Sequence, residues 1–300
     1  MKKIIISLIL FTCISSSVFG QQDAMFTKYM FNSLVFNPAY AGSQGYWDAN
    51  ITYRNQWLSL EGAPTTYLLG FEGAVNESVG LGLTLFSDQI GVDKRTDASL
   101  NYAYHIRTTE GKLSFGIKVG TAFFRTDFAD LDVEAGDPLY ATDIKTTNPY
   151  AGFGLFYNSD NFYMGISSPT LISFDINSSD GVPKFIKPHI YISIGSRNFI
   201  NENVELRPSI MGSFQKAAPP QAHLNLTAIF SNRFALGLSY RTGDALSFSA
   251  MIFVSKKFRI GASYDYTLSK LRTFNNGSVE ATMGYSFGTQ INKIQGVRNL

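Results

Sequence analysis

The sequence predicts an all-β protein: a transmembrane outer-membrane β-barrel of about fourteen antiparallel strands with a short N-terminal periplasmic or lumenal segment. First, apolar and polar residues alternate with the strand period of two along most of the chain. Second, only 16% of the 300 residues are charged, whereas 45% are hydrophobic and 14% aromatic; a soluble domain carries about 25% charged residues. Third, the region after residue 20 has no run of about 20 apolar residues, which argues against membrane-spanning helices.

Residues 1–20 are predicted to be a signal peptide. Lys2 and Lys3 precede an apolar run, and small residues follow up to Gly20. Cleavage there would remove Cys13, the one cysteine, and with it disulfides, thiol catalysis and cysteine metal sites. Lipidation of Cys13 is an alternative that Thr12 before it disfavours. The full sequence has 25 basic and 23 acidic residues, and loss of Lys2 and Lys3 would leave 23 of each. The sequence has no cluster of basic residues that would indicate a nucleic-acid partner.

Residues 21–45 form a separate N-terminal segment, because they do not alternate. Phe26, Tyr29, Met30 and Leu34 are spaced along one helical face, and a short helix would end at Asn37-Pro38. Two interpretations remain open. The segment packs against the barrel end or inside the lumen, or it docks a periplasmic partner.

Residues 46–288 are predicted to form the barrel. The clearest alternation runs from Thr96 to Arg107, where Leu100, Tyr102 and Tyr104 face away from the polar side chains between them. The same reading gives fourteen candidate strands: 46–58, 65–75, 79–87, 95–107, 112–125, 149–158, 161–168, 187–197, 203–215, 220–230, 233–242, 244–254, 257–268 and 278–288.

The connections between these strands alternate in length. Those such as Asn76–Ser78 and Ser255–Lys257 are short, whereas Ser87–Lys94, Thr126–Asn148 and Pro169–Ile186 are long; Lys216–Pro219 and Thr242–Asp244 break the trend. Short periplasmic turns and longer extracellular loops are typical of outer-membrane barrels. The chain is therefore predicted in the cell outer membrane, in contact with its lipid, with residues 289–300 as a periplasmic tail. The strands of a periplasmic β-sandwich also alternate apolar and polar residues, but a sandwich does not require short and long connections to alternate along the chain.

The polar face of the strands is predicted to fill the lumen. Its charged candidates mix both signs, which suits internal ion pairs better than an ion-selective ring: Asp97, Arg107, Glu205, Arg207, Arg241, Arg259, Asp265 and Glu280. Three histidines share this face, His105, His189 and His223, without a metal-binding spacing. His105 shares it with Asp97, Ser99 and Asn101, but no nucleophile elbow is present. We predict no catalytic residue, metal or cofactor.

An acidic stretch lies in the longest predicted loop, Thr126–Asn148. Asp130, Asp132 and Glu134 resemble the start of a calcium loop, but Ala135 stands where an EF-hand requires glycine. A solvated acidic loop is the simpler interpretation. Together with Pro169–Ile186, it is a candidate surface for an exported partner.

The run from Tyr29 to Gly42, with Asn37-Pro38-Ala39-Tyr40-Ala41-Gly42 at its centre, resembles the N-terminal signature of the PorP/SprF family. Asn55-Gln56-Trp57 and Pro64-Thr65-Thr66-Tyr67 resemble further landmarks of that family, and Leu81-Gly82-Leu83 and Gly136–Tyr140 match more weakly. The specific motifs lie within residues 29–70.

This resemblance implies an outer-membrane component of the type IX secretion system. It would act without catalysis in the secretion or surface attachment of adhesins that carry a C-terminal sorting domain, and in gliding in some bacteria. Periplasmic secretion-system components are further implied partners. The candidate partner-binding residues are Tyr29, Phe31, Asn37, Pro38, Tyr40, Asp130, Asp132, Glu134 and Asp137. A porin or small-molecule transporter is the alternative, followed by a membrane-embedded enzyme.

Overall fold

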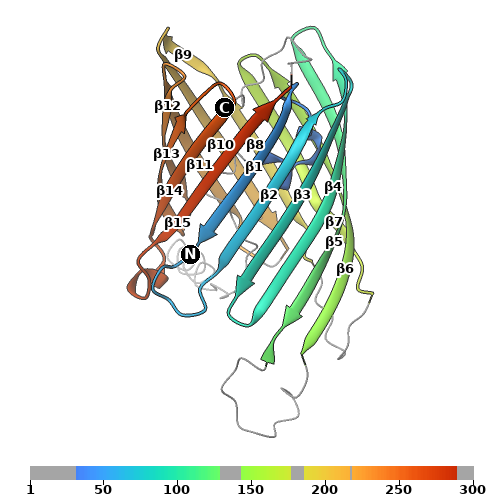
Figure 1. Ribbon diagram of the computed structural model, residues 1–300, viewed down its shortest axis with the longest axis vertical. Coiled ribbons are helices and arrows are strands. Elements are labelled where there is room, and N and C mark those ends of the chain that lie inside the picture. Colours follow the sequence, from blue (N-terminus) through green and yellow to red (C-terminus); the bar gives the residue numbers. More distant parts are fainter. Residues whose placement is uncertain (1–31, 129–142, 177–185, 217, 289–300) are drawn as a thin grey trace, which may run out of the picture.

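The computed structural model describes residues 32–128, 143–176, 186–216 and 218–288, and they form a closed antiparallel barrel (Figure 1). The strands are β1 (Trp47–Asn55), β2 (Thr65–Ala74), β3 (Val79–Ile90), β4 (Asp93–Arg107), β5 (Gly111–Thr126), β6 (Ile144–Ser159), β7 (Phe162–Ser173), β8 (His189–Ser196), β9 (Asn198–Asn201), β10 (Val204–Gln215), β11 (Gln221–Phe230), β12 (Phe234–Arg241), β13 (Ala245–Phe253), β14 (Phe258–Thr267) and β15 (Ser278–Phe287). Strands β8 and β9 lie on either side of Arg197, and both pair with β10. They therefore act as one interrupted strand, and the barrel has the predicted fourteen strands.

Each strand pairs with its neighbours in sequence, and β15 pairs with β1 to close the barrel. The closing register runs from Trp47 opposite Phe287 to Asn55 opposite Val279. The barrel begins and ends at the same mouth as the short turns, at the top of Figure 1. In an outer-membrane barrel this is the periplasmic mouth.

Alternation places apolar side chains outside and polar ones inside. On β4, Asp97, Ser99, Asn101 and His105 are buried, whereas Leu100 between them is 60% exposed. A closed sheet satisfies its backbone hydrogen bonds within itself, so this apolar outer face can lie against lipid. At the periplasmic ends, Trp47, Phe71 and Phe287 stack with centroids 5.1 and 5.8 Å apart, as aromatic residues do at a membrane interface.

The fourteen predicted strands are all present, with three differences in their limits. The Ser87–Lys94 connection was wrongly predicted to be long, because β3 and β4 continue to a tight turn at Gly91, whose φ is +56°. Strand β6 begins at Ile144 rather than 149, and β7 continues past Pro169 to Ser173. A register irregularity between Ala151 and Phe153 accommodates this proline without breaking the strand.

Three short helices complete the described structure: α2 (Ser33–Phe36), η1 (Pro38–Tyr40) and η4 (Lys270–Thr273). No helix in the described part of the chain is long and apolar enough to cross a membrane. The predicted signal peptide, residues 1–20, and the predicted tail, residues 289–300, lie outside the described residues.

Candidate functional site

Residues 32–45, called the plug below, lie inside the barrel. Asn37 sets their path between α2 and η1: its side-chain oxygen accepts from the Ala39 N–H at 2.9 Å, and its amide donates to the Leu155 carbonyl of β6 at 2.9 Å. Pro38 occupies the first position of η1, where its missing N–H costs nothing. The Asn-Pro pair therefore caps a turn and fixes it to the wall.

Glycines on the wall make room for the plug backbone. A Cβ atom added at Gly80 would lie 2.0 Å from the Ala41 oxygen, and one at Gly116 would lie 2.0 Å from the Ala39 nitrogen. At Gly154 it would lie 2.1 Å from the Asn37 side chain. Strands β3, β5 and β6 thus omit a side chain where the plug approaches most closely, a usual role of glycine within a strand.

Aromatic packing carries the plug across the lumen. Phe36 forms a buried cluster with Leu68 of β2, Tyr191 of β8 and Met211 of β10, and its ring meets Tyr191 edge-on at 5.1 Å. Tyr40 packs against Phe156 of β6 at 5.5 Å. Because the Phe36 cluster joins strands from opposite parts of the wall, it obstructs the lumen at that level.

Polar contacts hold the plug at five further points. Lys112 donates to the Ser43 carbonyl at 3.0 Å and Lys118 donates to the Val35 carbonyl at 3.3 Å. Glu72 accepts from the Gly42 N–H at 3.0 Å, Asn32 donates to Thr52 at 3.2 Å, and Ser167 donates to the Phe36 carbonyl at 2.7 Å. The prediction of lumenal charges omitted both lysines, although their alternating positions on β5 could have identified them.

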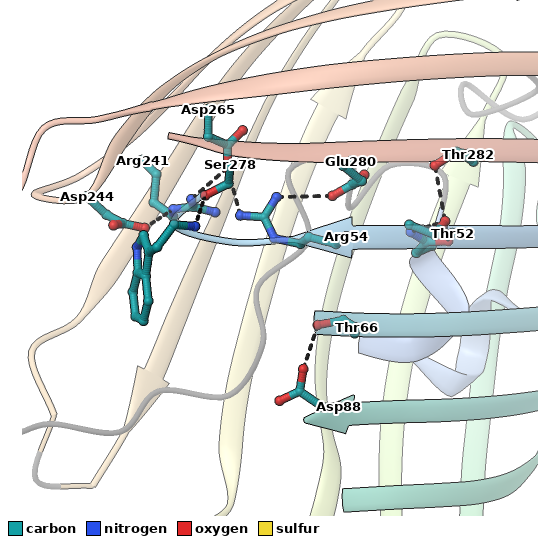
Figure 2. Close-up of polar contacts among 12 residues, drawn as sticks. Thr52, Arg54, Thr66, Asp88, Arg241, Asp244, Asp265, Ser278, Glu280 and Thr282 are labelled. Carbon is teal, nitrogen blue, oxygen red and sulfur yellow. Dashed lines mark hydrogen bonds and ion pairs between the residues drawn. The ribbon is translucent and has the colours of Figure 1, made fainter. Parts of the chain in front are cut away.

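Ion pairs fill the lumen near the extracellular mouth. Figure 2 shows Arg54 of β1 pointing between Asp265 of β14 and Glu280 of β15, and these contacts measure 2.7 and 3.3 Å. Arg241 of β12 lies 3.1 Å from Asp265 and 2.5 Å from Asp244. The side chains of Arg54, Asp265 and Glu280 are at most 2% exposed. This buried network crosses the β1–β15 seam, and Arg54 was absent from the predicted set.

Further ion pairs lie on other parts of the wall. Near the periplasmic mouth, Arg259 binds Asp48 through two contacts of 2.8 and 2.6 Å. Glu205 lies between Arg197, at 2.8 Å, and Arg207. Of the eight predicted lumenal charges, Arg107 is wrong: its side chain is 51% exposed and pairs with Glu77 at the rim. The other seven are buried: Asp97, Glu205, Arg207, Arg241, Arg259, Asp265 and Glu280.

Cavities remain around this filling in the described part of the chain, and two of them bear on function. One of about 60 Å³ lies beside the plug, between Phe36, Arg95, Lys118 and Tyr150. The second, of about 550 Å³, lies at the periplasmic mouth against β13–β15.

The histidine set considered for catalysis is not assembled. His105 lies 2.7 Å from Ser114, whereas Asp97 accepts from Tyr150 at 2.6 Å and pairs with Arg95. Eight residues of one strand separate Asp97 from His105, about 27 Å at the usual rise. The described residues hold no group of three or more His, Cys, Asp or Glu side chains arranged for a metal ion.

The predicted partner-binding residues fall into two groups. Asn37, Pro38 and Tyr40 are buried in the plug, where the barrel wall covers most of their surface. The others lie outside the described residues: Tyr29, Phe31, Asp130, Asp132, Glu134 and Asp137. Partner binding by either group stays a prediction.

Comparison with solved structures supports the architecture. The toluene transporter TbuX of Ralstonia pickettii is 11% identical, with a TM-score of 0.50 over 86% of this chain and 92% of that one. A deletion mutant of the monoaromatic hydrocarbon channel TodX is also 11% identical, with a TM-score of 0.50 over 89% of this chain and 95% of that one. At this identity, the likeness shows the fold alone.

The family comparison covers almost the whole barrel. No curated protein matches the chain significantly. The family model described as "Type IX secretion system membrane protein PorP/SprF" matches residues 18–285, from before the plug to the last strand. The chain is therefore an outer-membrane β-barrel that belongs to the PorP/SprF family of type IX secretion system membrane proteins.

Proposed function

We propose that this barrel acts without catalysis in the secretion or surface attachment of exported adhesin-type proteins that carry a C-terminal sorting domain. The observation that carries the proposal is the filled lumen: the Phe36 cluster crosses it, and the Arg54 network occupies the extracellular end. A barrel filled in this way offers its two mouths, rather than a passage, to other molecules. That favours a protein-binding role over the porin alternative.

The shape of the extracellular end supports the same role. Strands β4, β5 and β6 have 15, 16 and 16 residues, whereas about 9–11 suffice to cross a bilayer. Their extra length lies at the end away from the short turns, where the wall extends furthest in Figure 1. The tip is polar on both faces, with Asp93, Lys94 and Thr96 exposed. A projecting wall of this kind gives an exported protein a rigid surface beside the predicted acidic loop.

Surface display tests this role directly. Deleting the gene should leave the adhesin synthesised but not surface-attached, as measured by labelling intact cells and by immunoblotting whole lysates. Re-expression of the full chain should restore display. Unchanged display in the deletion strain contradicts the proposal.

A charge variant tests the acidic loop. Asp130→Asn, Asp132→Asn, Glu134→Gln and Asp137→Asn together should reduce display at a normal barrel level if the loop is the contact. The matched control neutralises four exposed acids on the opposite mouth: Glu77, Glu110, Asp160 and Glu202. Equal display in both variants removes the loop from the proposal but not the barrel.

Conductance distinguishes the porin alternative. Purified barrel in planar bilayers should show no large stable channels, because the plug and the ion pairs occupy the lumen. Large stable channels in the unmodified chain contradict the occluded lumen and favour a porin.

A further inference from the structure

The larger cavity lies at the periplasmic mouth and combines aromatic rings with lysines. Its volume is about 550 Å³, and the tight turn between β13 and β14 supplies Lys256 and Lys257. Four rings line it: Tyr46, Phe253, Phe258 and Phe287. Phe253 also packs against the lumenal cluster of Ile229, Ala235 and Met251. Phe258 and Phe287 lie on the outer face of their strands, each next in sequence to a lumenal residue, Arg259 and Ser286. The cavity therefore lies at the periplasmic end of the wall, between its lumenal and outer faces.

The cavity has an excess of positive charge. Arg259 lines it too, but Asp48 neutralises this guanidinium. Lys256 and Lys257 are exposed. Among the described residues, no ion pair joins either lysine to another side chain, and no carboxylate lines the cavity. Burial, together with the nearby Asp48 carboxylate, raises the pKa of Tyr46 to about 12, so this ring contributes no negative charge. Two unneutralised cations therefore stand beside a mainly apolar surface.

The charge of the periplasmic rim also differs between its two sides, and the cavity lies on the basic side. Four consecutive turns, from β2–β3 to β9–β10, each carry an exposed acid: Glu77, Glu110, Asp160 and Glu202. Arg107 pairs with Glu77, so the negative side of the rim rests on the other three. The next two turns carry only bases: Arg233, Lys256 and Lys257. Complementary charge of this kind orients a protein partner as it docks. A fluid lipid leaflet around the barrel has no such orientation to match, so the polarity favours a protein.

We propose that this cavity binds a segment of a periplasmic protein in which carboxylates alternate with aromatic or aliphatic side chains. The carboxylates would pair with Lys256 and Lys257, while the apolar side chains would pack on Phe253, Phe258 and Phe287. The chain's own residues 289–300 fit poorly, because they contain Lys293 and Arg298 and no acid. The inference rests on the periplasmic orientation of this mouth and not on which exported protein the barrel serves.

Peptide binding to the purified full barrel tests the proposal. The barrel is placed in phosphatidylcholine nanodiscs, and fluorescence anisotropy compares labelled peptides that alternate Asp with Phe or Lys with Phe. The Asp-Phe peptide should bind preferentially, and Lys256→Glu with Lys257→Glu should weaken it by about tenfold or more. Added salt should weaken binding to the unmodified barrel, because these lysines are exposed.

A matched charge reversal at the other mouth is the control. Lys94→Glu with Lys270→Glu changes the same number of exposed lysines and should leave binding unchanged. Ser255→Trp fills the cavity without changing charge and should also weaken binding. Equal binding of both peptides overturns the proposal, as does insensitivity to the Lys256 and Lys257 reversal. Lysine-dependent copurification of anionic phospholipid without peptide binding assigns the cavity to lipid and overturns it too. Because these assays use purified barrel, they are independent of adhesin display.

Discussion

At the scale of single residues, Arg54 of β1 stabilises the barrel through contacts with residues 211 and 226 positions away in the sequence. Its guanidinium lies between two buried carboxylates, so Arg54→Ala would leave Asp265 and Glu280 with less compensation in a low-dielectric lumen. Removing one partner of a buried ion pair costs about 3–5 kcal/mol. We expect a loss of that order in the free energy of unfolding, measured by urea titration of the purified barrel.

Arg107 provides the matched control for Arg54. It also pairs with a glutamate, Glu77 at 2.8 Å, but both side chains are more than half exposed. Solvent screens such a pair, and Arg107→Ala should change the free energy of unfolding by less than about 1 kcal/mol. Equal effects of the two substitutions would show that the Arg54 network does not stabilise the barrel.

Gly116 tests the fit of the plug at the level of one methyl group. In Gly116→Ala the new carbon would meet the backbone of Ala39, which cannot rotate away as a side chain does. Overpacking of this kind costs about 1–3 kcal/mol. We expect faster amide hydrogen exchange across residues 33–45, measured by mass spectrometry.

Gly212 is the control for Gly116. A methyl group there meets only the flexible end of Phe214, at 3.1 Å, away from the plug. Gly212→Ala should leave exchange in residues 33–45 unchanged. Unchanged exchange in Gly116→Ala as well would mean that the plug is not held as tightly as its backbone contacts imply.

At the scale of elements, the plug is the part of the structure with the clearest separable role. Deletion of residues 32–45 removes the Phe36 cluster and the carbonyls that Lys112 and Lys118 bind. The wall itself closes through β1–β15 pairing without them. The deletion variant should therefore insert as a barrel and show conductance steps in planar bilayers that the full chain lacks. If the deletion variant shows no conductance, the ion pairs alone are sufficient to occlude the lumen.

The strands could be predicted because apolar residues face lipid and polar residues face the lumen, so the two kinds alternate in the sequence. The errors occurred where this alternation is lost or where a proline interrupts it. Ile144–Thr147 extend β6 at its extracellular end, where polar residues no longer alternate with apolar ones. Pro169 appeared to end a strand, yet the irregularity opposite Gly152 absorbs it. Local sequence cannot show that a neighbouring strand compensates in this way.

The position of the plug was harder to predict than its existence. The loss of alternation before residue 46 marked a separate segment, and Asn37-Pro38 marked its turn. Its seat depends on Gly80, Gly116 and Gly154, which come from three different strands. Only the folded sheet brings them onto one surface, so helical spacing favoured packing against the barrel end or inside the lumen without choosing between these two places. The same holds for the cavity at Lys256 and Lys257, which includes Tyr46 from the other end of the chain.

At the scale of the whole molecule, the seam between the first and last strands defines the closed state. Thr52 of β1 and Thr282 of β15 face each other in the lumen with their hydroxyl oxygens 3.1 Å apart. Thr52→Cys with Thr282→Cys should form a disulfide in the oxidising periplasm, detected as a mobility shift on a non-reducing gel. Asn50→Cys with Thr282→Cys is displaced by two residues, to about 7–8 Å, and should not. Bridging of both pairs, or of neither, would contradict this register.

The position of the plug also constrains the order in which the molecule is assembled. Its contacts lie mainly on β1–β8, the strands that follow it directly in the sequence, whereas the seam needs β15. The first half of the chain thus contains both the plug and most of its seat before the last strand is available. Once β15 pairs with β1 and Arg54 binds across them, the wall is continuous around the plug. We therefore expect the plug to be seated while the sheet is still open, with the N-terminal residues as a template around which the later strands curve.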